Sequence, residues 1–531
     1  MADKRSAVRR VAFPSLLLSL LAGAAAVAGF APFELWPLPV LSLAVLFGQL
    51  SRTASVRTGF LTGFAWGLGF FLTGVSWVFI SLWVYGGMPA WLAGLATFLF
   101  CAFLALFPAA VGALQAYPKA HQHGRITPVF RFVLMIPLAW SVTEWTRGWI
   151  FTGFPWLVVG YSQVPNGPLA GYAPLVGVYG VSFVLALIAG LLAWGVTTRG
   201  PLAPRVWAAA AIVTLGVGGQ ALHDVQWTTP DGPPTTVALL QGNIPQDMKW
   251  RPETTRATLE TYARMAAASP AQLIVLPETA LPLFESELPD DYRDGLISLG
   301  RQNGGDVLTG LPTGWLGGAY YNSAVSFGSA PSQRYSKVHL VPFGEYIPLK
   351  AVWGWVIEVL HVPLSDFARG AVDQRPLAIG GQRVAADICY EDAFGEEIIR
   401  QLPQASVLVN VSNLAWFGDS LAPWQHAQMS EMRALETGRM MLRATNTGLT
   451  AIIDAKGRVL ASLPLFTAGS LSGTIQGYAG STPYVRWGNA PVLALWGILG
   501  IVLLALALYP RGAGRGCTAA EAATATLRRR P

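Results

Sequence analysis

The run DICYE, from Asp387 to Glu391, contains a cysteine, Cys389, directly after an apolar segment. This cysteine is the starting point for interpreting the rest of the chain. Two charged residues stand in similar places upstream: Glu278 closes the run VLPE, and Lys337 lies in YSKVHL. A thiol attacks a carbonyl carbon well only as thiolate, so it needs a base for its proton and a cation or N–H donors for the developing oxyanion. We therefore predict that Glu278, Lys337 and Cys389 form a catalytic triad.

Short apolar runs alternate with amphipathic stretches through the polar segment around these residues, from 223 to 489. TVALL and LIVL end in Gln-Gly-Asn and Pro-Glu, as buried strands do at the edge of a sheet. We predict strands at 236–240, 273–276, 306–310, 323–327, 384–388, 406–410 and 450–453. Helices are predicted at 252–268 and about 424–440. The pattern indicates a layered α/β domain.

The order glutamate, lysine, cysteine, each beside an apolar run, resembles the nitrilase (carbon–nitrogen hydrolase) superfamily. The resemblance implies an αββα sandwich for residues 223–489. It also implies that Glu278 is the general base and Cys389 the nucleophile. Lys337 would then hold the oxyanion, together with the backbone N–H that follows Cys389.

The remainder of the chain has the composition of a membrane protein. Over the whole chain of 531 residues the mean hydropathy is +0.44, and 12% of the residues are charged. A helix needs about 20 apolar residues to cross roughly 30 Å of hydrocarbon. We predict a multi-span helical membrane domain of about eight such helices, at residues 11–30, 35–50, 58–82, 88–116, 129–146, 172–197, 206–222 and 490–509.

Loop charges predict how these helices are oriented, because lysine and arginine in short loops stay on the cytoplasmic side. Basic residues precede the first run and follow the second, fourth, sixth and last, whereas the alternate short loops contain only Arg147. We expect both termini in the cytoplasm and the α/β domain on the opposite side. The expected divisions are a membrane domain at 1–222, a catalytic domain at 223–489, a last helix at 490–510 and a disordered basic tail at 511–531.

Longer motifs resemble one membrane-bound branch of the superfamily, the apolipoprotein N-acyltransferase family. They occur in both parts of the chain: APFELWPL (31–38), FTGFPW (151–156), LLQGNIPQ (239–246), Lys249-Trp250, Pro277-Glu278-Thr279, KVHLVPFGEY (337–346), ICYE (388–391) and Trp416-Phe417-Gly418. The resemblance implies a multi-pass enzyme of the bacterial inner membrane with its catalytic domain in the periplasm, and we expect a monomer.

The same resemblance implies the substrates and the chemistry. A fatty acyl chain would pass from a phospholipid to a thioester on Cys389. The α-amine of a diacylglyceryl-cysteine at the start of an apolipoprotein would then accept it as an amide. No cofactor is implied.

Three residues are expected to support the triad. Glu345 and Glu391 are candidate second carboxylates, and the alternative is that they pair structurally with Lys337 or with backbone donors. Tyr390 is expected to shape the acyl pocket rather than to react.

Aromatic residues are expected to bind the substrates. Trp250 is placed beside the acyl pocket. Trp416 and Phe417, which precede a glycine, and the apolar run VWGWVI (352–357) are expected to face lipid as an entry portal. Ordinary core packing is the alternative for these two groups.

Two positions depart from the family pattern. Leu414 stands where the family usually has an aspartate, and Trp83 where a histidine is common. Neither belongs to the triad. Glu144 and Arg147 lie near the outer end of the fifth apolar run, where an ion pair or a lipid headgroup contact is as plausible as catalysis.

Several classes of site are not expected. Cys389 is the sole cysteine between 223 and 489, and an unpaired thiol in an oxidising compartment is a liability unless it has a function. The six histidines show no metal-binding spacing outside the cytoplasm, so no metal site is predicted. The net charge of +7 follows from the basic loops and tail and does not indicate nucleic acid.

Two other functions fit part of the sequence. A membrane-anchored amidase of the nitrilase type would keep the triad but use water as acceptor, and would not need an apolar portal. A transporter with an external binding domain would need ionisable residues within its spans, and the central runs contain almost none.

Overall fold

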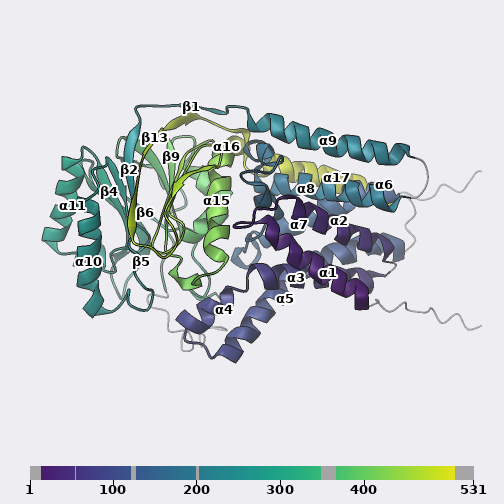
Figure 1. The fold of residues 1–531 in the computed structure, drawn as a ribbon, viewed down its shortest axis with the longest axis horizontal. Coiled ribbons are helices and arrows are strands. Elements are labelled where there is room, and N and C mark those ends of the chain that lie inside the picture. Colours follow the sequence, from purple (N-terminus) through teal and green to yellow (C-terminus); the bar gives the residue numbers. More distant parts are fainter. Residues whose placement is uncertain (1–12, 54, 121–126, 199–201, 349–365, 509–531) are drawn as a thin grey trace, which may run out of the picture.

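The computed structural model describes residues 13–53, 55–120, 127–198, 202–348 and 366–508. The predicted portal run 352–357 and the predicted tail 511–531 lie outside these ranges. Within them the chain forms two parts, a bundle of helices and a sandwich of sheets and helices (Figure 1). The last helix of the chain returns to the bundle after the sandwich is complete.

Two six-stranded sheets form the centre of the sandwich. The first has the order β13-β2-β3-β4-β5-β6 and the second β12-β11-β10-β9-β8-β7. The first sheet comprises β2 (Thr235–Gln241), β3 (Leu273–Val275), β4 (Asp306–Gly314), β5 (Tyr320–Gly328), β6 (Arg334–Ser336) and β13 (Gly469–Ile475). The second comprises β7 (Leu377–Ile379), β8 (Gln382–Ile388), β9 (Val407–Ser412), β10 (Met441–Thr445), β11 (Ala451–Ile453) and β12 (Val459–Ser462). A short ribbon joins β1 (Thr228–Pro230) to β14 (Tyr478–Gly480).

Helices cover the outer face of each sheet. The first sheet is covered by α10 (Pro252–Ala267) and α11 (Asp290–Gln302), and the second by α15 (Ala422–Thr437) (Figure 1). Between the sheets, apolar side chains of β2 and β3 such as Leu239 and Val275 share one buried cluster with Val384 and Val407 of the second sheet. The prediction of an αββα sandwich is confirmed, because each sheet buries one face on the other and the opposite face under helices.

The parallel strands decide where the site lies. β2, β3 and β4 run parallel to one another in the first sheet, and β5 then pairs antiparallel with β4. In the second sheet β8, β9 and β10 run parallel to one another. The carboxyl ends of parallel strands meet at one edge of a sheet. Glu278 follows β3 and Cys389 follows β8, so both lie at such an edge.

Each of the predicted apolar runs is helical over most of its length. The helices are α1 (Phe13–Ala26), α2 (Pro37–Arg52), α3 (Val56–Gly74), α4 (Val78–Ile80) with η2 (Ser81–Tyr85), α5 (Ala90–Ala120), α6 (Pro128–Phe130) with η3 (Arg131–Met135), α7 (Ile136–Arg147), α8 (Ala173–Thr197), α9 (Ala203–His223) and α17 (Ala490–Leu508). Short helices α14 (Gly395–Ile398) and α16 (Pro483–Trp487) flank the sandwich.

The predicted number of about eight spanning helices is not confirmed. In the described ranges, three helices are long and apolar enough to cross a membrane: Ala90–Ala116, Ala170–Thr197 and Ala203–His223. A fourth candidate is the pair Val56–Gly74 and Val78–Tyr85, which is bent by 57°. α2 has 16 residues, and at about 1.5 Å per residue it does not reach roughly 30 Å.

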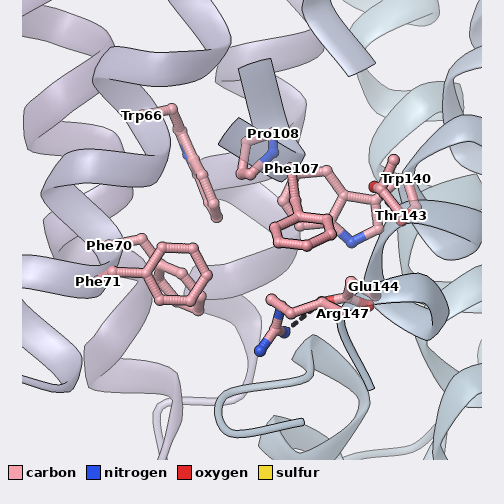
Figure 2. A pocket seen from close by; sticks show the side chains of 9 residues that line it. All are labelled: Trp66, Phe70, Phe71, Phe107, Pro108, Trp140, Thr143, Glu144 and Arg147. Atoms are coloured by element: carbon pink, nitrogen blue, oxygen red, sulfur yellow. Dashed lines mark hydrogen bonds and ion pairs between the residues drawn. The ribbon is translucent and has the colours of Figure 1, made fainter. Parts of the chain in front are cut away.

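Glu144 and Arg147 lie beneath an aromatic cluster inside the bundle. Figure 2 shows Trp66, Phe70 and Trp140 above the pair. Arg147 Nη1 donates to the carbonyl oxygens of Phe154 and Trp156, at 2.5 and 2.7 Å. Glu144 Oε1 accepts from the backbone N–H of Val159 at 3.0 Å. The pair therefore fastens the FTGFPW loop to α7.

The sandwich sits on the bundle through α15. Every residue of this helix except Trp424 is buried, and its apolar side chains share a cluster with the membrane aromatics. Gln428 Oε1 accepts from the backbone N–H of Ala31, and Glu436 Oε1 accepts from that of Val178. The sheet edge that carries Glu278 and Cys389 is thereby held at the end of the bundle.

Candidate active site

Glu278 is held by hydrogen bonds to both carboxylate oxygens. Oε1 accepts from Asn322 Nδ2 at 2.8 Å, and Oε2 accepts from the backbone N–H of Asn413 at 2.8 Å. The next residue, Thr279, has φ of 44°, a left-handed conformation that a β-branched residue rarely adopts. Gly310 on β4 makes room for this turn, since a Cβ there would lie 2.6 Å from Glu278 Cα. The carboxylate is fixed in one orientation.

Lys337 is a buried cation between two carboxylates. It is 1% exposed, and its Nζ lies 3.5 Å from Glu278 Oε1 and 3.0 Å from Glu345 Oε2. Burial lowers the pKa of Lys337, but Glu345 and Glu278 outweigh burial and raise that pKa above its ordinary value. The ammonium therefore stays charged and can stabilise negative charge on a substrate oxygen.

Cys389 stands at the sharp turn from β8 into the short helical turn Cys389–Ala393, with φ of 55°. Its side chain is partly exposed. Burial and the charge of Glu278 raise the pKa of the thiol, Lys337 opposes them, and the net pKa lies above the ordinary value. At neutral pH the thiol is therefore protonated and needs a base to become a nucleophile.

The structure brings the three predicted triad residues to one edge of the sandwich. A carboxylate, an ammonium and a thiol meet there although they lie far apart in the sequence. This arrangement can take a proton from sulfur, hold an oxyanion and form an acyl thioester.

The two supporting carboxylates have different surroundings. Glu345 pairs with Lys337, and its Oε2 also accepts from the backbone N–H of Val341 at 2.8 Å. Glu391 is 2% exposed and accepts from the backbone N–H groups of Val338, His339 and Ile388 at 2.7, 3.0 and 2.8 Å. Burial raises the pKa of Glu391 to about 7, against the lowering effect of these donors. Glu391 thus ties the segment after Lys337 to the turn at Cys389.

Two polar residues of the site were missed from the sequence. Asn322 Nδ2 donates to Oε1 of both Glu278 and Glu345, at 2.8 Å each. Lys249 is 2% exposed, and its Nζ donates to the carbonyl oxygen of Glu278 at 3.0 Å and to Thr279 Oγ1 at 2.6 Å. Burial lowers the pKa of Lys249 to about 8, although Glu278 and Cys389 oppose that shift. The sequence signal for Lys249 was its position between two large apolar residues, Met248 and Trp250.

The predicted aromatic residues do not all lie at the triad. The Tyr390 hydroxyl donates to the Gly153 carbonyl oxygen at 3.0 Å, and its ring stacks on Trp156 at 6.4 Å. Tyr390 therefore joins the catalytic turn to the FTGFPW loop of the bundle. Trp250 is partly exposed, two residues before α10.

The Trp416 loop contacts the bent helical segment of the bundle. The Trp416 carbonyl oxygen accepts from Ser81 Oγ at 2.7 Å, and the Phe417 ring lies 4.8 Å from Trp77. Leu414, one of the departures from the family pattern, is fully buried and faces Gly448. Trp83, the other departure, is 49% exposed and packs on Phe79 at 5.3 Å.

Two family models match the chain. The apolipoprotein N-acyltransferase N-terminal domain matches residues 22–191, which lie in the bundle. The carbon–nitrogen hydrolase model matches residues 236–484, which form the sandwich. Among solved structures, an amidase variant of the nitrilase superfamily from Nesterenkonia AN1 is 20% identical, covers 50% of this chain and 98% of that one, and has a TM-score of 0.37.

Curated relatives match nearly the full length. The apolipoprotein N-acyltransferase of Nitrosomonas europaea is 53% identical over 91% of this chain and 96% of its own. That of Methylococcus capsulatus is 47% identical over 92% of this chain and 95% of its own. Identity at this level across nearly the whole of both chains means that the chain belongs to the apolipoprotein N-acyltransferase family.

Proposed function

We propose that the chain is a membrane-bound acyltransferase that carries a fatty acyl group on Cys389 between a phospholipid and the α-amine of an apolipoprotein's diacylglyceryl-cysteine. The observation that carries the proposal is Lys337, a buried ammonium 3.5 Å from Glu278 and beside a thiol that needs a base. These are the parts that acyl transfer through sulfur requires. Family membership supplies the substrate class.

The first half-reaction acylates the enzyme. Glu278 takes the proton of Cys389, and the sulfur attacks an ester carbonyl carbon of the phospholipid. Lys337 and the backbone N–H of Tyr390 hold the oxyanion, a task worth about 10²–10³ in rate for each donor. The C–O bond to glycerol then breaks, Glu278 returns its proton to the leaving oxygen, and a lysophospholipid departs.

The second half-reaction discharges the thioester. An α-amine attacks only when neutral, and its pKa of about 8 makes removal of a proton by a nearby carboxylate useful. Glu278 accepts a proton from the attacking nitrogen, the C–S bond breaks, and the sulfur recovers a proton. The product is an amide at the N-terminus of the apolipoprotein.

The other predicted residues have proposed roles around this path. Glu345 is proposed to hold Lys337 in place, in keeping with their 3.0 Å contact. Glu391 and Tyr390 are proposed to fix the turn that presents the thiol. Trp250, Trp416 and Phe417 are proposed to contact the acyl chains of the substrates.

A mass spectrum of the intact enzyme after incubation with phospholipid alone tests the mechanism. We expect Cys389 to gain one fatty acyl group and one lysophospholipid to leave per enzyme. A diacylglyceryl peptide with a free N-terminal cysteine should then remove the adduct as an N-acyl peptide, with ping-pong kinetics. Continuous release of fatty acid without acceptor would indicate the amidase alternative, and the absence of any adduct on Cys389 would refute the covalent path.

We further propose the organisation expected from the sequence: about eight spans, both termini in the cytoplasm, and the domain 223–489 in the periplasm of a bacterium. The positive charge of the alternate loops supports this orientation. A thiol reagent that cannot cross membranes, added to intact spheroplasts, should label Cys389 and leave Cys517 unlabelled. Labelling of Cys517 alone would mean that the chain has the opposite orientation to the one proposed.

A further inference from the structure

Two side chains hold the carbonyl oxygen of Cys389 from behind the site. His426 Nε2 lies 3.0 Å from this oxygen, and Asn410 Nδ2 donates to it at 3.3 Å. Both residues are essentially buried, with exposures of 1% and 0%. Neither takes part in the proposed proton transfers, so their arrangement needs another explanation.

Arg443 determines which nitrogen of His426 carries the proton. Arg443 Nη2 lies 2.8 Å from His426 Nδ1, and a guanidinium can only donate. Nδ1 must therefore be the acceptor, so the hydrogen of the neutral ring is on Nε2 and points at the Cys389 carbonyl oxygen. Burial and Arg443 both lower the pKa of His426, which keeps the ring neutral. Arg443 Nη1 also donates to Asn410 Oδ1 at 3.0 Å.

The peptide unit held in this way is the one that carries the proposed oxyanion donor. The carbonyl of Cys389 and the N–H of Tyr390 belong to the same planar peptide and point in opposite directions. Fixing the carbonyl therefore fixes the direction of the N–H. A peptide whose carbonyl accepts strong hydrogen bonds is also polarised, which strengthens its N–H as a donor.

We propose that His426, Asn410 and Arg443 form a carbonyl clamp, a group of positioning residues that aims the Tyr390 N–H at the oxyanion of both half-reactions. The inference rests on the proposed function, because it assumes that a tetrahedral oxyanion forms next to Cys389. It assigns no contact with substrate to the clamp, which lies behind the catalytic turn.

The clamp is also in contact with the bundle. The His426 ring stacks on Trp156 at 5.6 Å, with 24° between the ring planes. The adjacent Gln425 accepts hydrogen bonds at Oε1 from the indoles of Trp156 and Trp77, at 2.6 and 3.2 Å. A useful variant of His426 should therefore keep an aromatic ring, so that packing on the bundle is preserved.

Three substitutions separate the N–H of His426 from its bulk. His426→Phe keeps the stacked ring and removes the donor. His426→Asn and His426→Gln differ by one methylene, and an amide of glutamine reaches the Nε2 position whereas that of asparagine falls short. Thr437→Val, at the far end of α15, is the control for a substitution inside the same helix, since Thr437 bonds only the helix backbone.

Two rates are measured in the full-length enzyme in detergent: single-turnover acylation of Cys389 by phospholipid, and alkylation of Cys389 by iodoacetamide. Acylation passes through an oxyanion, whereas alkylation does not. We expect His426→Phe and His426→Asn to lower acylation by about 10- to 100-fold, less than loss of a whole donor. Alkylation should stay within about twofold, because the thiol itself is unchanged. His426→Gln should recover most of the acylation rate, and Thr437→Val should match wild type.

Two results would overturn the inference while leaving the proposed function intact: equal, undiminished acylation in the asparagine and glutamine variants, or alkylation that falls in parallel with acylation. The second would mean that His426 positions the thiol rather than the N–H. A wild-type enzyme that forms no adduct at all would instead refute the proposed function, so the two failures are distinguishable. If the phenylalanine variant does not fold, the comparison of the asparagine variant with the glutamine variant still tests whether a donor at the Nε2 position is needed.

Discussion

At the scale of single residues, the surroundings of Cys389 disfavour its thiolate form. Burial and Glu278 raise the pKa of its thiol, and Lys337 only partly offsets them. A protonated thiol resists oxidation and unwanted alkylation. In the proposed mechanism Glu278 takes the proton, so the same carboxylate would disfavour the thiolate by its charge and form it by accepting the proton.

This double role predicts opposite effects on the thiol for two inactivating substitutions. Glu278→Gln removes a negative charge, so the pKa of Cys389 should fall and iodoacetamide alkylation should be half-maximal at lower pH than in wild type. Lys337→Met removes a positive charge, so the pKa should rise and the midpoint should move to higher pH. Both variants should lose acyl transfer by at least about 100-fold, since each removes one catalytic function.

The measurement is the alkylation rate of Cys389 across a pH series, compared with transfer to a diacylglyceryl peptide. Exposed Glu260→Gln on α10 is the control for loss of a carboxylate. Midpoints that move in the same direction for the two variants would contradict the electrostatic account of the site. Retention of more than about a tenth of wild-type turnover by either variant would contradict its catalytic role.

A pair of glycines tests the strained turn at Glu278. At Gly310 a new Cβ would meet Glu278 Cα at 2.6 Å, whereas at the exposed helical Gly295 it would meet nothing within 4 Å. Gly310→Ala should therefore displace Glu278 and reduce both turnover and thermal stability. Gly295→Ala should leave turnover unchanged and raise stability by about 0.5–1 kcal/mol, the helix propensity difference. Thermal unfolding and turnover of the two variants, measured together, check this; equal behaviour would show that the turn tolerates a side chain.

The triad residues could be nominated from sequence because each ends or follows an apolar run and has a distinctive chemical function. Asn322 and His426 could not, and Lys249 appeared only as part of the Lys249-Trp250 motif. Their importance comes from contacts across strands, such as the Asn322 bridge between Glu278 and Glu345. No local pattern reports a contact between residues 44 positions apart.

At the scale of elements, the strands with continuous apolar runs were predictable and the others were not. β8 and β9 lie close to the predicted ranges, because each is largely buried and contains a short apolar run, VAA in β8 and VLV in β9. β13 has the sequence GSLSGTI and is largely exposed, so it has no apolar run to detect. The helix predicted to reach about 440 ends at Thr437, because Gly438 adopts φ of 63° and terminates it. The chain then enters β10, which was not predicted.

The membrane helices show where hydropathy alone is insufficient. The apolar runs were correctly located, yet several of the helices are too short to cross roughly 30 Å by themselves. α2 contains 16 residues, and α3 continues into the segment α4–η2 across a bend of 57°. Composition reports that a run is apolar, but it does not report where the helix bends or ends.

Glu391 connects two elements, so its substitution should lower the stability of the fold. It accepts backbone hydrogen bonds from the segment after β6 and from the end of β8. Glu391→Gln keeps the shape but turns an amide N–H₂ toward these donors, leaving at least one buried group unsatisfied at about 1–3 kcal/mol. We expect a clearly lower thermal midpoint in detergent. Glu260→Gln, which breaks an exposed ion pair with Arg256, should cost at most about 0.5 kcal/mol.

The result also separates structure from catalysis. If Glu391 is structural, the surviving folded fraction of Glu391→Gln should acylate Cys389 at a rate close to wild type at low temperature. A variant with wild-type stability and no acylation would instead make Glu391 the second catalytic carboxylate.

At the scale of the whole molecule, the contact between sandwich and bundle combines apolar side chains of α15 with polar groups that no sequence pattern pairs. Gln425, Gln428 and Glu436 of α15 bind indole and backbone groups of the bundle. Tyr390 and His339 reach the carbonyl oxygens of Gly153 and Thr152. Both parts could be predicted separately, but the way they dock could not, because each of these bonds joins residues at least 187 positions apart.

This docking predicts the behaviour of the sandwich on its own. Met429, Met432 and Leu435 of α15 are buried with the bundle aromatics, and each would lose about 1.5–3 kcal/mol of burial if the bundle were removed. Glu436 and Gln428 would lose partners as well. The cores between the sheets and beneath α10 and α11 contain no described residue of the bundle, so they should survive.

A fragment of residues 223–489 should therefore keep its β-sheet circular dichroism while associating and binding a hydrophobic dye. Replacing Met429, Met432 and Leu435 by serine should reduce association of the fragment. The same replacement in the full-length enzyme should lower the stability of the enzyme. A wild-type fragment that is monomeric and dye-free would mean that α15 does not depend on the bundle for its burial.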